Sequence, residues 1–203
     1  MPTTNTTNKR PFCNCKNLTM WKMTDEEAET YSSTAISFEK RLTTYSDSVG
    51  SNSTLLYGDG ELLETVVTEG EGTLRLGIHH ITDEERKDIY NEVDENGAVI
   101  STGDEYAPFM CVALMAVKRS GKVNLRKYFK VAFSKHEESV NQQENSGVSY
   151  SMPTLQGTYS KNTALGWKSA RREVDPSTAE GKTIIENWFS QADYIGPTTT
   201  TTP

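Results

Sequence analysis

The chain has 203 residues, a formal net charge of −7 and a sequence pI of ≈ 5.1, a balance that disfavours tight binding of phosphate backbones through Lys and Arg. Hydrophobic residues make up only 34% of the sequence and the mean hydropathy is −0.62, which favours one domain that completes its fold by pairing strands with neighbouring subunits. No apolar run reaches the ~20 residues of a membrane-spanning helix, and no basic-then-apolar signal opens the sequence. We therefore expect a protein that is made in the cytosol and does not insert into membranes.

Catalytic and metal-binding patterns are missing from the sequence. Cys13, Cys15 and Cys111 form an odd set without a CxxC pair, so neither a disulfide framework nor a zinc site is indicated. His79 and His80 are neighbours in a predicted strand and point to opposite faces, so they cannot share one ion. No nucleophile lies in a G-x-S-x-G frame, and no Walker or Rossmann glycine pattern occurs. We expect no enzyme, no catalytic residues, no metal and no cofactor.

Polar, low-complexity ends flank a single predicted domain. We expect residues 1–12 to form a flexible N-terminal arm, residues 13–195 the domain, and residues 196–203 a disordered Thr/Pro tail. Residues 17–23 alternate well enough to predict a short first strand. Residues 35–45 place apolar side chains among charges and β-branched Thr, which predicts a half-buried strand.

A polar stretch over residues 46–60 interrupts the strand pattern. Its Ser, Asn, Asp and Gly content predicts a loop around a small apolar group of Leu55, Leu56 and Tyr57. Loops of this length are uncommon inside compact domains and usually have a binding function. We therefore expect this loop to contact a partner.

A second, acidic hairpin and a short helix follow this loop. Residues 61–68 and 73–81 predict two strands around a turn at residues 69–72. Thr82 and Glu85 then form a capping box, which predicts a helix with acidic residues in its first turn. The Asn-Gly pair at positions 96 and 97 predicts a tight turn.

The longest predicted element is a β-hairpin over residues 106–134. Its first arm contains nine uncharged residues at 109–117, which fit a strand buried on both faces, although periodicity alone also permits a helix there. The return arm decides for a strand because its apolar residues alternate with polar ones, with Lys127 as the exception on the apolar face. The apolar positions are Val123, Leu125, Phe129, Val131 and Phe133, and Tyr128 is assigned to the polar face.

The C-terminal part of the domain predicts another strand pair and a helix. Residues 136–149 predict a polar loop, and residues 150–159 and 164–174 predict two paired strands. Ser177 and Glu180 start a helix whose apolar face includes Trp188. The predicted fold class is therefore β-rich α+β, an antiparallel sandwich or barrel flanked by one or two helices.

Charge is distributed unevenly along the chain. Residues 59–95 contain twelve acidic and three basic residues, whereas residues 118–135 contain seven basic and no acidic residues. Complementary surfaces on identical copies would explain this asymmetry. Two solvated faces that never meet explain it equally well.

The order of motifs resembles a known family. The sequence has LLYGDGELLETVV after a polar stretch, LRLGIHHIT before the DEERKDIYNEVDENG helix and turn, the long hairpin, then MPTLQG and a helix that contains Trp188 and Phe189. With these motifs, most of the chain resembles the major tail proteins that build the tail tube of bacteriophages with long, non-contractile tails. The motifs are structural, so the resemblance implies an architecture and an assembly and no active site.

The resemblance implies a tail-tube fold whose long hairpins form an inner β-barrel between subunits. It implies homo-hexameric rings that stack into a tube, through which DNA passes without specific binding. Other expected partners are the tape-measure, tail-terminator and distal tail proteins, and the expected location is the virion tail after synthesis in the host bacterial cytoplasm. Hairpins with unpaired edges are a liability in a monomer, and ring closure would remove those edges.

Three sets of candidate residues follow from this expectation. The inter-ring contact is assigned to the predicted loop, at Val49, Leu55, Leu56 and Tyr57. A channel for a polyanion should not offer it cations, so the lumen is assigned to Glu61, Glu64, Glu69 and Glu71. The subunit interface is assigned to the basic tip Lys118, Arg119 and Lys122, facing Asp83, Glu84 and Asp88 of another copy. The alternative for each charge is a solvated position on the tube exterior.

Two other functions remain open at this point. One is the tube of a related prophage-derived or secretion-type particle, which differs in what travels inside. The other is a small-ligand-binding or adhesion β-barrel, which requires a pocket lined by apolar residues with a few polar ones.

Overall fold

The computed structural model describes residues 11–59, 61–136 and 152–197, and these residues form eleven strands and two helices. The elements are β1 (Phe12–Asp25), β2 (Thr30–Tyr31), β3 (Ile36–Phe38), β4 (Leu42–Gly58), β5 (Glu61–Ile78), α1 (Asp83–Tyr90), β6 (Val93–Glu95), β7 (Ala98–Ile100), β8 (Met110–Lys118), β9 (Val123–Ser134), β10 (Thr154–Ser160), β11 (Ser169–Val174) and α2 (Ala179–Ser190). The β-rich α+β class predicted from the sequence is confirmed. Neither helix is long and apolar enough to cross a membrane.

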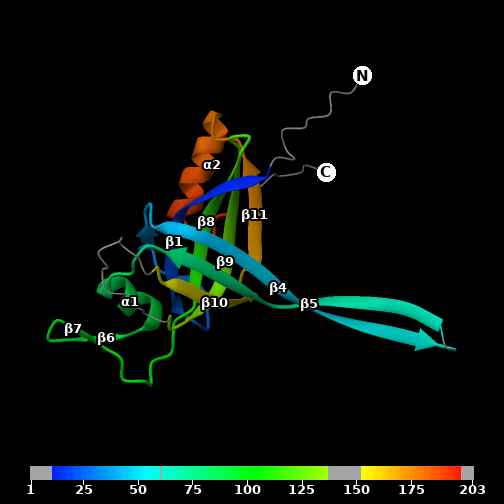
Figure 1. The fold of residues 1–203 in the computed structure, drawn as a ribbon, viewed down its shortest axis with the longest axis horizontal. Helices are drawn as coiled ribbons and strands as arrows, with labels where there is room; N and C mark the ends of the chain where they lie inside the picture. The colour runs from blue at the N-terminus through cyan, green and yellow to red at the C-terminus, as the bar shows by residue number, and fades with distance from the viewer. Residues whose placement is uncertain (1–10, 60, 137–151, 198–203) are drawn as a thin grey trace, which may run out of the picture.

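Nine strands form one antiparallel sheet in the order β2, β1, β8, β9, β10, β5, β4, with β3 also on β1 and β11 also on β9. The sheet curls into a half-barrel, so β4 and β5 cross its concave face (Figure 1). Sγ of Cys15 in β1 lies 3.7 Å from the carbonyl oxygen of Thr43 in β4, which shows that these two strands approach each other. Strands β6 and β7 form a separate two-stranded sheet.

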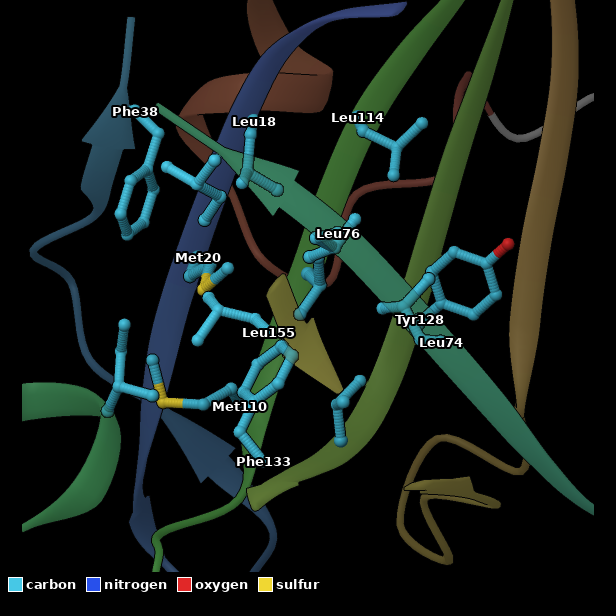
Figure 2. Packing of buried hydrophobic residues seen from close by; sticks show 14 of the residues in the cluster. Leu18, Met20, Phe38, Leu74, Leu76, Met110, Leu114, Tyr128, Phe133 and Leu155 are labelled. Carbon is cyan, nitrogen blue, oxygen red and sulfur yellow. The ribbon is translucent and has the colours of Figure 1, made fainter. Parts of the chain in front are cut away.

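Two core clusters lie on the two faces of this sheet. Figure 2 shows side chains from β1, β3, β5, β8, β9 and β10 that meet inside the curl. The second cluster packs the outer face of β1, β8, β9 and β11 against α2, with Trp21 and Trp188 as its largest fully buried side chains. Strand β8 is buried on both faces because it lies between these clusters, as the sequence predicts.

The long hairpin is confirmed as β8 and β9, but the predicted faces of β9 are partly wrong. Met110 pairs with Val131 and Val112 pairs with Tyr128, so β9 has one extra residue between the two pairs. This bulge reverses the side-chain alternation. Tyr128 and Val131 therefore both point into the curl, and Phe129 points towards α2. Tyr128 is buried, whereas the uninterrupted pattern assigned it to the polar face.

Lys127, the exception in the predicted apolar face, is fully buried beneath α2. Its Nζ donates hydrogen bonds to the carbonyl oxygens of Gln191 at 2.7 Å and Tyr194 at 2.9 Å, just after the helix ends. The ammonium also lies 4.8 Å from the ring centroid of Trp188 and 5.3 Å from that of Trp21. The ammonium therefore satisfies the carbonyl group of the C-cap residue Gln191 and that of Tyr194 beyond it, near the negative end of the helix dipole.

Both predicted helices are present. Thr82 and Glu85 form the expected capping box at the start of α1. At α2 the N-cap is Thr178 rather than Ser177, because its hydroxyl accepts a hydrogen bond from the amide of Gly181 at 3.0 Å. A Cβ on Gly181 would lie 1.9 Å from the carbonyl oxygen of Asp175, so this glycine permits a close approach.

The predicted loop at residues 46–60 and the predicted turn at residues 69–72 are both wrong. Residues 42–58 form the single strand β4, and residues 61–78 form the single strand β5, which pairs with β4 from Leu42–Ile78 to Gly58–Glu61. Asn and Gly have low strand propensity, but pairing with β5 overrides local propensity here.

Other strand predictions need smaller corrections. The first strand is longer than predicted and already begins at Phe12. The strand predicted at residues 35–45 divides into β3 and the start of β4. Strands β10 and β11 both exist, but each pairs with β9 and not with the other. The predicted Asn-Gly turn joins β6 to β7, and the predicted polar loop after residue 136 lies outside the described residues.

Candidate assembly surface

The distal halves of β4 and β5 form a hairpin that projects away from the body of the molecule (Figure 1). The two strands pair from Ser51–Glu69 to Gly58–Glu61, and β10 covers the outer edge of β5 only as far as Gly72. Beyond that point, the described residues of the hairpin pair only with each other. We call residues 51–69 the projecting hairpin.

The projecting hairpin exposes large apolar side chains. Every side chain described at residues 51–57 and 64–69 is exposed. The exposed fractions of the large apolar side chains are Leu55 48%, Leu56 54%, Tyr57 60%, Val66 43% and Val67 63%. These residues gather apolar area on one narrow element, which is typical of a surface that another molecule covers.

Both faces of the projecting hairpin are apolar in part. Leu55 pairs with Thr65 and Val67 with Ser53, so Leu55 and Val67 lie on one face. The alternation of the strand places Leu56 and Val66 on the opposite face. An isolated two-stranded hairpin without a packed face is marginally stable in water. The described side chains of the projecting hairpin therefore give it no packed face within the single chain.

The hairpin leaves the body at an irregular point of the ladder. Val49 pairs with Gly72 and Ser51 with Glu69, so β5 has one extra residue across this step. A Cβ on Gly72 would lie 2.1 Å from Cζ of Tyr159, so the absence of a side chain there lets the tyrosine ring pack against the strand. Bulges of this type bend a strand and increase its twist.

On the β4 side of this exit point, the carboxylate of Asp47 accepts hydrogen bonds from three side chains of the body. Arg126 NH1 in β9 lies 3.0 Å from Asp47 Oδ1, and Arg171 NH2 in β11 lies 2.7 Å from Oδ2. The Tyr45 hydroxyl donates to the same carboxylate at 2.5 Å and is itself hydrogen-bonded to the Tyr128 hydroxyl and to Arg126. Burial alone would raise the pKa of Asp47, but the Tyr45 hydrogen bond and the charges of Arg171 and Arg126 more than offset it, so the pKa lies below its ordinary value.

On the β5 side, Lys168 holds the backbone of the hairpin. Its Nζ donates a hydrogen bond to the carbonyl oxygen of Gly70 at 2.5 Å and lies 4.0 Å from Oε2 of Glu69. The same ammonium lies 5.3 Å from the ring centroid of Tyr159. Both strands of the hairpin are therefore held at their root by cations of β9, β11 and the residue just before β11.

The residues assigned to an inter-ring contact lie on β4, and all four are exposed. Val49 lies at the root, and Leu55, Leu56 and Tyr57 lie towards the tip. The residues assigned to the lumen lie on β5 and are also exposed, but the structure does not bring them together on one face. Glu64 pairs with Leu56 and Glu69 with Ser51, and the regular ladder between these pairs places the two glutamates on opposite faces.

The basic tip of the β8–β9 hairpin is partly neutralised within the chain. Lys118 forms an ion pair with Glu173 of β11, and Nζ of Lys122 lies 4.0 Å from the same carboxylate. Arg119 is exposed. The acidic residues assigned as its partners, Asp83, Glu84 and Asp88, are exposed on α1 at the other end of the body (Figure 1). A contact between these two sets requires two copies of the chain.

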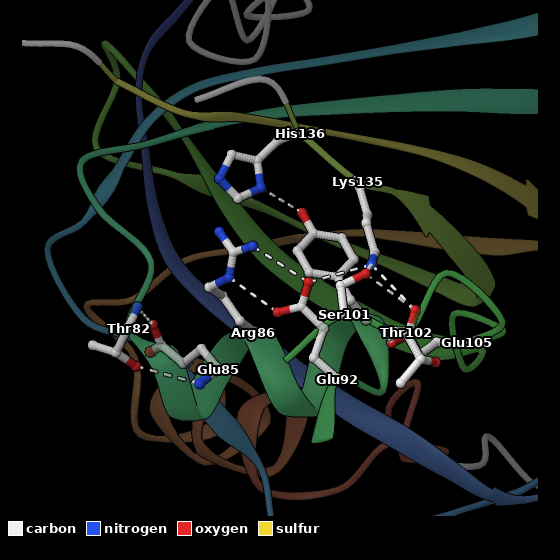
Figure 3. Close-up of polar contacts among 10 residues, drawn as sticks. Thr82, Glu85, Arg86, Glu92, Ser101, Thr102, Glu105, Lys135 and His136 are labelled. Carbon is white, nitrogen blue, oxygen red and sulfur yellow. Dashed lines mark hydrogen bonds and ion pairs between the residues drawn. The ribbon is translucent and has the colours of Figure 1, made fainter. Parts of the chain in front are cut away.

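A polar network attaches α1 and the β6–β7 hairpin to β9 (Figure 3). Glu92 is buried and forms ion pairs with Arg86 at 3.1 Å and with Lys135 at 3.4 Å. Nζ of Lys135 also lies 3.3 Å from Oε2 of Glu105, and this carboxylate accepts a hydrogen bond from the backbone amide of Gly103. These groups are mutually satisfied and support a structural role for the network.

The half-barrel interior is filled by the first core cluster, which does not favour a ligand inside it. A hollow of about 450 Å³ lies on the outer side, between Trp21, the β1–β2 turn, residues 164–165 and the end of α2. Glu29 lines this hollow, and its carboxylate already accepts hydrogen bonds from Lys130 and from the backbone amides of Thr163 and Ala164. Within the described residues, no cluster of three or more His, Cys, Asp or Glu side chains could hold a metal ion.

Comparison with known proteins gives no family assignment. No family model and no curated protein matches the sequence. The chain is similar to a chain in the cryo-electron-microscopy structure of the anti-feeding prophage baseplate, 6-fold symmetrised. The match has 10% sequence identity and a TM-score of 0.37, and it covers 83% of this chain and 98% of that chain. A TM-score of this size establishes neither a common fold nor a common role.

Sequence reasoning missed Val66 and Val67 as surface residues and Asp47, Arg126, Arg171 and Lys168 as contacts at the hairpin root. The two valines had a usable signal, because the Thr-Val-Val-Thr run at residues 65–68 has no alternation that would hide one face. The root contacts join residues 79 to 124 positions apart along the chain. No local pattern identifies such pairs.

Proposed function

We propose that this chain is a structural subunit of a phage-type tail tube, which assembles into stacked hexameric rings without catalysing a reaction. The observation that supports this proposal best is the projecting hairpin, which is apolar on both faces and exposed in the single chain. A second copy would cover this area and pair the free strand edges. The motif order that resembles major tail proteins supports the same role.

In this proposal the tube belongs to the virion tail, and DNA passes through it. The projecting hairpin carries Asp59, Glu61, Glu64 and Glu69 and no basic residue, so it would repel phosphates wherever it faces a channel. Because Glu64 and Glu69 lie on opposite faces, one face of the hairpin would present only one of them to the lumen. A tube of a prophage-derived or secretion-type particle would use the same surface with another cargo.

Substitutions on the two faces of the projecting hairpin test this proposal. Leu55→Ser with Val67→Ser removes two large apolar side chains from one face, and Leu56→Ser with Val66→Ser removes two from the other. We expect at least one pair to raise the concentration needed for assembly by tenfold or more, measured by light scattering and electron microscopy. Circular dichroism should show an unchanged fold, since these side chains are exposed in the subunit.

The matched control is Thr54→Ser with Thr65→Ser, which changes the same hairpin but leaves its large apolar side chains in place. This variant should assemble like the wild type. A wild-type protein that stays monomeric at every concentration would contradict the proposal. So would normal tubes from both apolar pairs of substitutions.

A further inference from the structure

The direction of the projecting hairpin depends on its root. Within the described residues, the hairpin beyond Ser51 and Glu69 has no strand neighbour, and its ladder to the body is interrupted by the bulge at Gly70 and Glu71. From Ser51 to the tip the hairpin spans roughly 20 Å at about 3.3 Å per residue. A rotation of roughly 10° at the root would therefore move the tip by roughly 4 Å.

The polar contacts at this root come from outside β4 and β5, and they reach both strands just before the projecting hairpin begins. Asp47 of β4 lies 3.0 Å from Arg126 and 2.7 Å from Arg171, and Lys168 donates to the carbonyl oxygen of Gly70 in β5. Arg171 and Lys168 lie only three positions apart in and just before β11. One short segment therefore contacts β4 at Asp47, which pairs with Leu74 on the body side of the bulge, and β5 at Gly70 within the bulge.

Partial burial makes the ion pairs of Asp47 stronger than those of exposed side chains. The side chains of Asp47 and Arg126 are only 12% and 11% exposed, whereas exposed pairs contribute little because water screens them. The guanidinium of Arg126 also lies 5.0 Å from the ring centroid of Tyr45 and 5.3 Å from that of Phe12, which restricts its position. Asp47 is thus bound to Arg126, whose position is fixed by the body and not by the projecting hairpin.

We propose that Asp47 and Lys168 are positioning residues that fix the angle of the projecting hairpin in the free subunit. Arg126 and Arg171 hold Asp47 on one strand, and Lys168 holds Gly70 on the other. The consequence for assembly rests on the proposed function: a hairpin that is already oriented loses less conformational entropy when a second copy binds it. The orientation itself does not depend on that function.

Distances between spin labels in the dilute subunit test the orientation directly. With Cys13→Ser and Cys15→Ser as background, labels at Thr54→Cys on the hairpin and Lys182→Cys on α2 report the angle, since both positions are exposed. We expect Asp47→Asn with Lys168→Met to at least double the width of the distance distribution. Asp59→Asn, which also removes one acidic charge near the tip of the hairpin, should leave the width unchanged.

A second variant keeps the test decisive if the loss of Asp47 unfolds the subunit. Arg171→Gln with Lys168→Gln leaves the half-buried Asp47–Arg126 pair in place, and it should broaden the distribution by at least half. An unchanged width in the folded variants would overturn the proposal. A broader distribution in these variants supports the proposed orientation whether or not the subunits assemble. The proposed function fails by a different result, a wild-type subunit that never forms tubes.

Discussion

At the scale of single residues, two charged groups organise the molecule, the half-buried Asp47 and the fully buried Lys127. Asp47 marks the exit of the projecting hairpin, and Lys127 marks the end of α2. The sequence identifies Lys127 because it breaks an apolar pattern, but it does not reveal which carbonyl groups the ammonium binds. Asp47 has no such signal, because its partners belong to β9 and β11.

The titration of Lys127 predicts how stability depends on pH. Burial lowers the pKa of Lys127 to about 8, from an ordinary value of 10.5. Between these two values the unfolded chain binds more protons than the folded chain, so this group makes the protein more stable as the pH rises from 8 towards 10.5. We expect the unfolding free energy of the wild type, compared with that of Lys127→Met, to increase by about 1–3 kcal/mol over this range.

Denaturant unfolding of both proteins at pH 7.5 and pH 10 provides the measurement. Other groups that titrate in this range, including the tyrosines, are common to the two proteins, so their effects cancel in the difference. A difference between wild type and Lys127→Met that does not change with pH would show that Lys127 titrates normally in the folded state.

At the scale of elements, local signals predict some parts of the fold and tertiary pairing decides others. The capping box of α1 and the Asn-Gly turn between β6 and β7 are local, and both are found where the sequence places them. The bulge in β9 is not encoded in the alternation of its own residues, so the face of Tyr128 was predicted wrongly. Strand β4 has the composition of a loop and becomes a strand only through its ladder with β5.

Close contacts at the root of the hairpin predict different effects on stability for two glycines of β5, Gly70 and Gly72. A Cβ on Gly72 would lie 2.1–2.5 Å from two ring atoms and the hydroxyl oxygen of the buried Tyr159. Gly72→Ala should therefore lower the unfolding free energy by about 1–3 kcal/mol through overpacking. On Gly70 the nearest atom would be the carbonyl oxygen of Gly50 at 3.5 Å, an ordinary contact. Gly70→Ala is therefore the matched control and should change stability by less than about 0.5 kcal/mol.

Thermal and denaturant unfolding of the two variants compare them directly. Equal effects of Gly72→Ala and Gly70→Ala would show that Tyr159 can move aside, and that the close approach of its ring does not constrain the hairpin root.

At the scale of the whole molecule, the body has a packed hydrophobic core, whereas the described side chains of the projecting hairpin are exposed. Two buried clusters fill the space inside the half-barrel and beneath α2. Among its described residues, the hairpin has no comparable core on either face, and five large apolar side chains are exposed. The low apolar content of the sequence predicts that neighbouring subunits complete the fold. The sequence assigned residues 46–60 to a loop, however, and paired residues 61–68 with residues 73–81 instead of with β4.

Hydrogen exchange at residues 51–69 tests most directly whether a second copy completes the hairpin. In dilute subunits these amides should exchange much faster than those of β8 and β9, which serve as an internal reference, because the described side chains of the hairpin are exposed on both faces. In concentrated, assembled protein, exchange at residues 51–69 should slow by at least 100-fold. Equal exchange of these amides in the dilute and the concentrated protein would contradict the account.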